Sequence, residues 1–157
     1  MIPVRTCLWY ESEAEEAARF YTSLVPGSAV EEVMRPAAEA PAVLVHFTLG
    51  GVPFSALNGG SWVAHTHAAS VVLEAPDQAE TDRLWQAILE NDGKEVQCGW
   101  ITDRWGVSWQ IIPQGFQELM FSADAEANQR AYQAMLKMIR LDLAAVRAAH
   151  EGKGGTA

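Results

Sequence analysis

Cys98-Gly-Trp-Ile-Thr-Asp-Arg-Trp-Gly-Val-Ser-Trp-Gln-Ile-Ile-Pro113 is the stretch that decides the fold of this chain, because it has the pattern of a β-hairpin. An apolar run over residues 96–102 leads into a turn at 103–106, and a second apolar run stops at Pro113. Gly106 can adopt the positive φ that tight turns require, and Pro113 lacks the N–H that would continue a ladder. Alternation along the second run places Trp109 and Gln110 on opposite faces of the predicted sheet.

The same pattern occurs in the first half of the chain. Gly51-Val-Pro-Phe-Ser55 matches Gly106-Val-Ser-Trp-Gln110 as glycine, valine, any residue, aromatic, polar. A capping box, in which a cap residue precedes a glutamate by three positions, starts a predicted helix at 12–15 and again at 77–80. The sequence therefore predicts two copies of one unit, each a strand, a helix and further strands.

The two copies occupy about residues 1–60 and 67–113 of a two-module domain that we place at 1–121. Pro53 inside a predicted strand favours a sheet edge or a bulge, because proline cannot donate to a ladder. The expected helices cover residues 12–24 and 77–90, and the expected strands cover 4–10, 31–34, 43–49, 52–57, 69–73, 96–102 and 107–112.

The C-terminal part of the chain has no counterpart in the first half. Residues 122–150 form a predicted helical extension of the same domain, with one long helix over 123–149 that packs on the modules or across a dimer interface. The glycine-rich segment 151–157 is predicted to be a flexible tail. The apolar stripe expected along the long helix consists of Tyr132, Leu136, Ile139, Leu143 and Val146.

Composition limits the possible partners. The 157 residues include 20 acidic and 11 basic side chains, giving a formal net charge of −9, whereas nucleic acids and anionic membranes both require a basic surface. No stretch has the roughly 20 apolar residues that cross a bilayer, and no signal peptide is recognisable, so we expect a cytoplasmic protein. Cys7 and Cys98 are then expected to be buried thiols rather than a disulfide.

These motifs resemble the PhnB-like group of the vicinal oxygen chelate superfamily, which also contains glyoxalase I and the bleomycin-resistance proteins. The resemblance rests on Phe20-Tyr21, the paired modules, Gly51–Ser55, Cys98–Pro113 and Ala134–Met138, and covers about residues 2–149. It implies an α+β fold of paired βαβββ modules, which form a curved mixed sheet around a cup-shaped cavity and are followed by a C-terminal helix. It also implies a homodimer.

Active members of the superfamily hold a divalent metal through His, Glu or Gln on particular strands. Carried over by position, with strand one uncertain by a residue in each module, these sites are Thr6, Ser55, Ser70 and Gln110. Hydroxyl groups are poor ligands for such ions, so we expect no metal cofactor at these positions. Two alternatives remain: His46, His65 and His67 bind a metal, or they lie in the linker and at a strand edge.

Tryptophans and small polar groups instead describe an aromatic small-molecule pocket. Asp103 and Arg104 are interpreted as an exposed turn pair, and no catalytic residue is assigned. We therefore expect a small-molecule-binding protein without a catalytic metal, the alternative being a metal-dependent lyase, isomerase or dioxygenase. The PhnB-like group is often labelled a methyltransferase, but the sequence lacks the glycine-rich strand–loop–helix segment of nucleotide-like cofactors. The expected pocket-lining residues are Thr6, Trp9, Ser55, Ser70, Trp100, Trp109 and Gln110.

Overall fold

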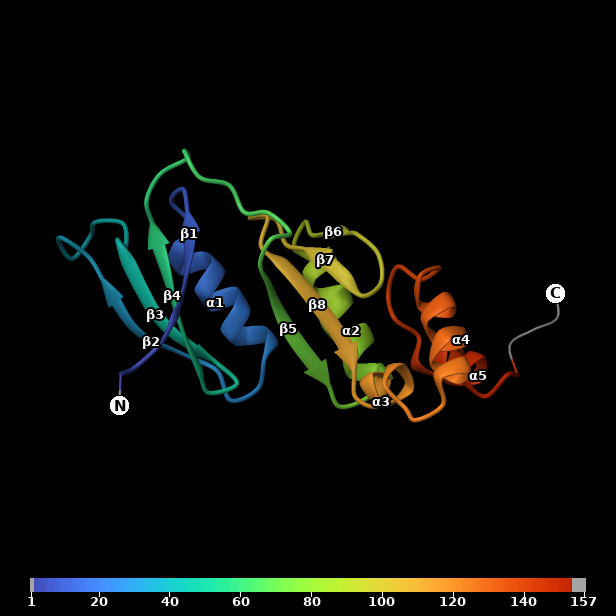
Figure 1. Ribbon diagram of the computed structural model, residues 1–157. Coiled ribbons are helices and arrows are strands. Elements are labelled where there is room, and N and C mark those ends of the chain that lie inside the picture. The colour runs from blue at the N-terminus through green and yellow to red at the C-terminus, as the bar shows by residue number, and fades with distance from the viewer. Residues whose placement is uncertain (1, 154–157) are drawn as a thin grey trace. The chain divides into compact units, whose positions relative to one another are not determined.

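The chain folds into two modules of identical topology, followed by a helical extension (Figure 1). The structure is a computed structural model that describes residues 2–153. Residues up to His65 form one compact unit, and residues from Thr66 onward form a second unit that includes the extension.

The first module has the predicted order of one strand, one helix and three strands. Its sheet has the strand order β1-β4-β3-β2, with β1 parallel to β4 and the other neighbours antiparallel. The β3–β4 hairpin turns at Gly50 and Gly51, which both have positive φ, as the sequence predicted. The elements are β1 (Thr6–Tyr10), α1 (Ala14–Leu24), β2 (Ala29–Met34), β3 (Leu44–Leu49) and β4 (Val52–Asn58).

The second module repeats this arrangement. Its sheet has the order β5-β8-β7-β6, with β5 parallel to β8 and the other neighbours antiparallel. The α+β fold with paired βαβββ modules is therefore confirmed. The elements are β5 (Ser70–Ala75), α2 (Gln78–Glu90), β6 (Lys94–Glu95), β7 (Trp100–Thr102) and β8 (Ser108–Pro113).

One helix lies against one face of each sheet (Figure 1). In the first module Tyr21 of α1 is fully buried and lies near Phe47 of β3, with ring centroids 6.3 Å apart. In the second module Trp85 and Ile88 of α2 are buried, as the predicted helical stripe requires. We call the face of each sheet that carries the helix the helix face, and the opposite face the far face.

The two helices start differently, although the sequence predicted the same capping box for both. In α2 the Asp77 side chain accepts a hydrogen bond from the Glu80 N–H at 2.8 Å, as predicted. The prediction for Ser12 is wrong, because α1 starts after Glu13 and has no side-chain cap of this kind. Instead Asn58, at the end of β4, accepts a hydrogen bond from the Ala14 N–H at 2.8 Å, so a tertiary contact replaces the local cap.

Pro53 lies in a strand that is central rather than at an edge, because β4 has β1 on one side and β3 on the other. The pairing with β1 begins only at Phe54, opposite Thr6. Pro53 therefore precedes the region where β4 has two neighbours, and its missing N–H is tolerated there.

The prediction of one long C-terminal helix is wrong. The extension contains three helices: α3 (Phe116–Met120), α4 (Ala125–Met135) and α5 (Leu143–His150). The carbonyl groups of Met138 and Ile139 accept hydrogen bonds from the N–H groups of Cys98 and Gly99, both at 2.8 Å. These carbonyls are thus engaged by the hairpin instead of by a helical turn, and Asp142 then caps a new helix.

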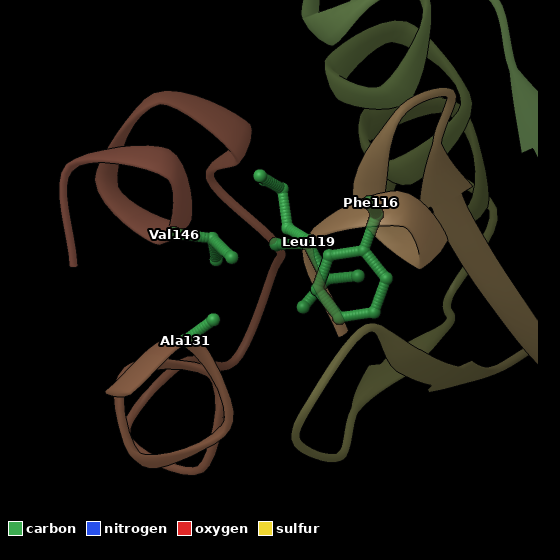
Figure 2. Close-up of a cluster of buried hydrophobic side chains, with 5 residues drawn as sticks. Phe116, Leu119, Ala131 and Val146 are labelled. Carbon is green, nitrogen blue, oxygen red and sulfur yellow. The ribbon is translucent and has the colours of Figure 1, made fainter. Parts of the chain in front are cut away.

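The extension has a hydrophobic core of its own (Figure 2). Side chains from α3, α4 and α5 converge there, and Val146 is the member of the predicted stripe that is fully buried. The stripe residues Tyr132, Leu136 and Ile139 are exposed, and α4 instead buries the face that carries Ala127 and Ala131. The buried cluster consists of Phe116, Leu119, Ala131, Leu141 and Val146.

Within residues 2–153, no helix combines the length and the apolar character needed to cross a bilayer. Of the predicted tail, Glu151 and Gly152 form a turn that ends α5, and residues 154–157 lie outside the described part of the chain.

Candidate functional site

A polar row crosses the far face of the first sheet. In the sheet register Cys7 of β1 lies opposite Ser55 of β4, Ser55 lies opposite His46 of β3, and His46 lies opposite Glu32 of β2. Directly paired residues of a sheet share a face, so these four side chains form one line across all four strands. We call them the polar row. Thr6 pairs with Phe54 and therefore belongs to the helix face, and the predicted strand-one position is filled by Cys7.

The groups of the polar row differ in their environments. His46 Nδ1 lies 3.5 Å from Glu32 Oε2, which is ion-pair distance. Ser55 is only 4% exposed. Cys7 is exposed, although the sequence predicted a buried thiol, and the partial loss of hydration of its thiolate on this face raises the pKa of the thiol. The row thus combines a largely buried hydroxyl, a neutral thiol and an imidazole beside a carboxylate.

Trp9 occupies the next position along the same face, where it pairs with Leu57. Its indole Nε1 donates to the Gly60 carbonyl at 2.8 Å, and its ring meets Trp62 edge-on with centroids 4.9 Å apart. A Cβ at Gly59 would lie 2.0 Å from the Trp9 ring, so only glycine fits there. The segment after β4 therefore folds back over Trp9 and leaves Trp62 as an exposed indole.

The far face of the second sheet carries the corresponding polar groups. Gln110 Nε2 donates to Ser70 Oγ at 2.8 Å, so this pair of predicted site residues is in direct contact. His67 Nδ1 and Ser108 Oγ are 2.9 Å apart. The His67 ring also meets Trp100 edge-on, with centroids 6.0 Å apart. Ser70, Trp100 and Gln110 therefore lie on one surface, together with His67 and Ser108.

Trp109 lies on the opposite side of that sheet. It is fully buried, and its Nε1 donates to Asp103 Oδ2 at 2.9 Å. Its partners in the register, Val71 and Ile101, belong to the helix face. The interpretation of Asp103 as an exposed turn residue is wrong, because its side chain is buried and bonds the turn from within.

The strand positions at which the resemblance implies metal ligands do not carry the donor set of a divalent metal site. The strand positions that face each other are Cys7 and Ser55 in the first module and Val72 and Gln110 in the second. A hydroxyl, a hydrocarbon and an amide are poor ligands for such ions, so Cys7 is the one strong donor among these four positions. Among residues 2–153, no group of three or more His, Cys, Asp or Glu side chains could hold a metal ion.

The sequence contained signals for residues that our expectations missed. Val45 and Phe47 are core residues of β3, so alternation alone would have placed His46 on the far face. The Cys7–Ser55 register depends on the parallel pairing of β1 with β4, which no local pattern fixes. His67 lies outside any strand, and only the folded structure brings it to Ser108.

Comparison with known proteins agrees with this geometry. Residues 3–112 match the family model described as 3-demethylubiquinone-9 3-methyltransferase. A PhnB protein from Bacillus cereus, provisionally assigned as a 3-demethylubiquinone-9 3-methyltransferase, is 26% identical with a TM-score of 0.65; the alignment covers 71% of this chain and 99% of that protein.

Two other solved structures share the fold at low identity. The fosfomycin resistance protein FosX from Listeria monocytogenes is 12% identical with a TM-score of 0.53, over 75% of this chain and 98% of that one. A glyoxalase/bleomycin resistance protein from Albidiferax ferrireducens is also 12% identical with a TM-score of 0.50, over 70% and 96%. Among curated proteins, no sequence matches this chain. The match to the family model ends before α3, so it leaves out the helical extension.

Proposed function

Since this chain belongs to the 3-demethylubiquinone-9 3-methyltransferase-like family, the PhnB-like group of the glyoxalase/bleomycin-resistance superfamily, we propose that it is a small-molecule-binding protein that works without a catalytic metal. The ligand class that fits is a small organic molecule with an apolar or aromatic body and a few hydrogen-bonding groups. We further propose that the protein acts as a homodimer, which is usual in this superfamily.

The observation that supports this proposal is the chemistry of the two far faces. Each combines a polar side chain on the fourth strand of its module, Ser55 or Gln110, with an indole on the same face, Trp9 or Trp100. Aromatic surfaces with a few fixed polar groups are typical of sites for small organic ligands. We propose Trp9 and Ser55 as ligand contacts on the first module, and Ser70, Trp100 and Gln110 as ligand contacts on the second module. Thr6 and Trp109 are left out because both belong to the helix faces.

A ligand titration followed by tryptophan fluorescence tests the proposal. We expect aromatic or amphiphilic organic molecules to change the emission, because Trp62 is exposed and Trp100 is partly exposed. Trp100→Phe should reduce this change, and Gln110→Ala should weaken the affinity about tenfold, as expected for one lost hydrogen bond. Gln86→Ala, on the outer side of α2, is the control and should bind normally. Binding that is equally strong in all variants would contradict the proposed contacts.

The alternative is a metal-dependent lyase, isomerase or dioxygenase of the glyoxalase type, supported by the fold alone. Metal analysis of the untagged protein separates the two. One tightly held ion per chain, whose removal abolishes ligand binding or turnover, would favour the enzyme and contradict our proposal. Equilibrium dialysis with S-adenosylmethionine tests the methyltransferase label in the same way, and we expect no binding.

A further inference from the structure

We propose that Glu32, His46 and Ser55 form an acid–base–nucleophile relay that accepts an acyl or phosphonyl group from small activated esters at Ser55. This activity goes beyond ligand binding. All three residues belong to the first module, and they lie on neighbouring strands in the order in which such a relay operates: carboxylate on β2, imidazole on β3, hydroxyl on β4.

The carboxylate and the imidazole are already close. Glu32 Oε2 lies 3.5 Å from His46 Nδ1, so the carboxylate can hold the tautomer that carries the proton on Nδ1. Nε2 is then the basic nitrogen. No hydrogen bond or ion pair occupies that nitrogen within residues 2–153. Nδ1 of His46 therefore faces Glu32, which orients the ring, and Nε2 is available for proton transfer.

The hydroxyl is the second observation, and it is independent of the first. Ser55 is 4% exposed, yet its side chain makes no hydrogen bond within the described residues. Among the described residues, Asn91 Nδ2 is the one fully buried side-chain N or O atom without a partner, so the Ser55 Oγ itself reaches solvent and is open to a reagent. In the antiparallel register Ser55 lies directly opposite His46, where Cβ atoms are typically about 4.5–5.5 Å apart. A rotation of the ring or of the hydroxyl can bring the two groups into contact.

The chemistry balances without any further reagent. Ser55 Oγ forms a bond to the carbonyl carbon or to phosphorus, and its proton passes to His46 Nε2. The bond to the leaving group breaks with its electron pair, and the leaving group takes up the proton. Glu32 stays ionised and stabilises the imidazolium that exists in between.

The second module provides an internal control. His67 Nδ1 and Ser108 Oγ are already in hydrogen-bond contact at 2.9 Å, whereas His46 and Ser55 are opposite each other in the strand register. However, no carboxylate lies within ion-pair distance of His67 in the described chain, and Ser108 is already bonded. If a serine–histidine contact alone were sufficient, Ser108 would react at least as fast as Ser55.

The test is labelling of the full-length protein with a fluorophosphonate, which reacts covalently with activated serines, followed by peptide mass spectrometry. We expect Ser55 to be labelled in the folded protein, with Ser108 unlabelled and no reaction after denaturation in urea. Ser55→Ala should abolish the labelling. His46→Asn should slow it about 100-fold or more, in line with general-base catalysis.

Glu32 is a positioning residue, so its role needs a separate readout. Glu32→Gln should slow labelling about tenfold, whereas Glu32→Asp, which keeps a carboxylate, should retain most of the rate. Far-UV circular dichroism and thermal unfolding of both variants should match the parent. An unlabelled Ser55, equal labelling of Ser108, or equal rates for the two Glu32 variants would each overturn the relay. None of these outcomes would contradict the proposed ligand binding, which tryptophan fluorescence measures separately.

Discussion

Asp103 and Trp109 are joined by a buried hydrogen bond in which the indole Nε1 donates to Oδ2 at 2.9 Å. The other carboxyl oxygen, Oδ1, accepts from the backbone N–H groups of Trp105 and Val107, both at 3.0 Å. The Asp103 side chain thus links the hairpin turn to β8 and fixes the direction of this strand. Because Gln110 is the next residue along β8, this contact also determines that Gln110 faces the other side of the sheet.

Replacing Asp103 should therefore destabilise the second module strongly. Asp103→Ala leaves the Trp109 indole and two backbone N–H groups without an acceptor in a buried place, and we expect a loss of about 3–5 kcal/mol in the free energy of unfolding. Urea denaturation followed by circular dichroism measures it. Glu118→Gln removes an exposed carboxylate from α3 and should change stability by less than about 0.5 kcal/mol. Equal stability of the two variants would show that the turn does not depend on Asp103.

A second prediction concerns Gly99, where the extension meets the hairpin. Gly99 has φ +81°, and an added Cβ would lie 2.9 Å from the Leu141 side chain and 3.2 Å from the Ile111 carbonyl oxygen. Gly51 has a similar φ of +84° but nothing within 4 Å of a Cβ, so it isolates the backbone cost.

We expect Gly51→Ala to cost about 1–2 kcal/mol, which is the penalty of the left-handed conformation. Gly99→Ala should cost about 1–3 kcal/mol more, because fully buried Leu141 must move. Unfolding free energies of both variants, measured under the same conditions, give the difference. Equal costs would mean that Leu141 adapts freely to an added methyl group.

Gln78 should hold the extension to α2. Its amide donates from Nε2 to the Leu141 carbonyl and accepts from the Leu143 N–H at Oε1, both at 2.9 Å, as a neighbouring strand would. Gln78→Ala should remove about 1–2 kcal/mol and speed amide hydrogen exchange over residues 138–146. Gln86→Ala, which loses only an exposed contact with Glu90, is the matched control. Unchanged exchange at Leu143 would contradict the role of Gln78.

The sequence predicted the parts of the fold that local patterns determine. The duplicated Gly-Val-x-aromatic-polar motif and the stripe on α2 were sufficient for the paired modules, because hydrophobic alternation and helical periodicity act over a few residues. The long C-terminal helix was wrong for the opposite reason. A continuous helical pattern is interrupted where the Met138 and Ile139 carbonyls bond Cys98 and Gly99, a contact between residues about forty positions apart.

In the candidate site, too, local patterns predicted some features, whereas others depend on pairing between distant residues. Alternation correctly separated Trp109 from Gln110 but could not assign Cys7 rather than Thr6, since that choice depends on the register of a parallel pair. Nor could it bring Glu32 beside His46, because the β2–β3 pairing has a register shift between Val30 and Glu32. A bulge changes which side chains face each other without leaving a clear pattern in the sequence.

Cys7 gives a prediction for the dependence on pH. Partial loss of hydration raises the pKa of its thiol, so at any pH below that value the reactive thiolate is scarcer than in a free cysteine. The rate of alkylation by iodoacetamide should therefore be lower than that of a cysteine-containing peptide at pH 8, and its midpoint should lie at higher pH. A Cys98→Ser background leaves Cys7 as the single thiol, and mass spectrometry after timed quenching gives the rates.

Ser55→Ala, which removes only the neighbouring hydroxyl, is the control for this experiment. It should leave the pH profile of alkylation almost unchanged, because lost hydration and not a hydrogen bond raises the pKa of the Cys7 thiol. A midpoint at or below that of the peptide would show that the thiolate is stabilised on this face and would contradict the assignment of the shift to lost hydration.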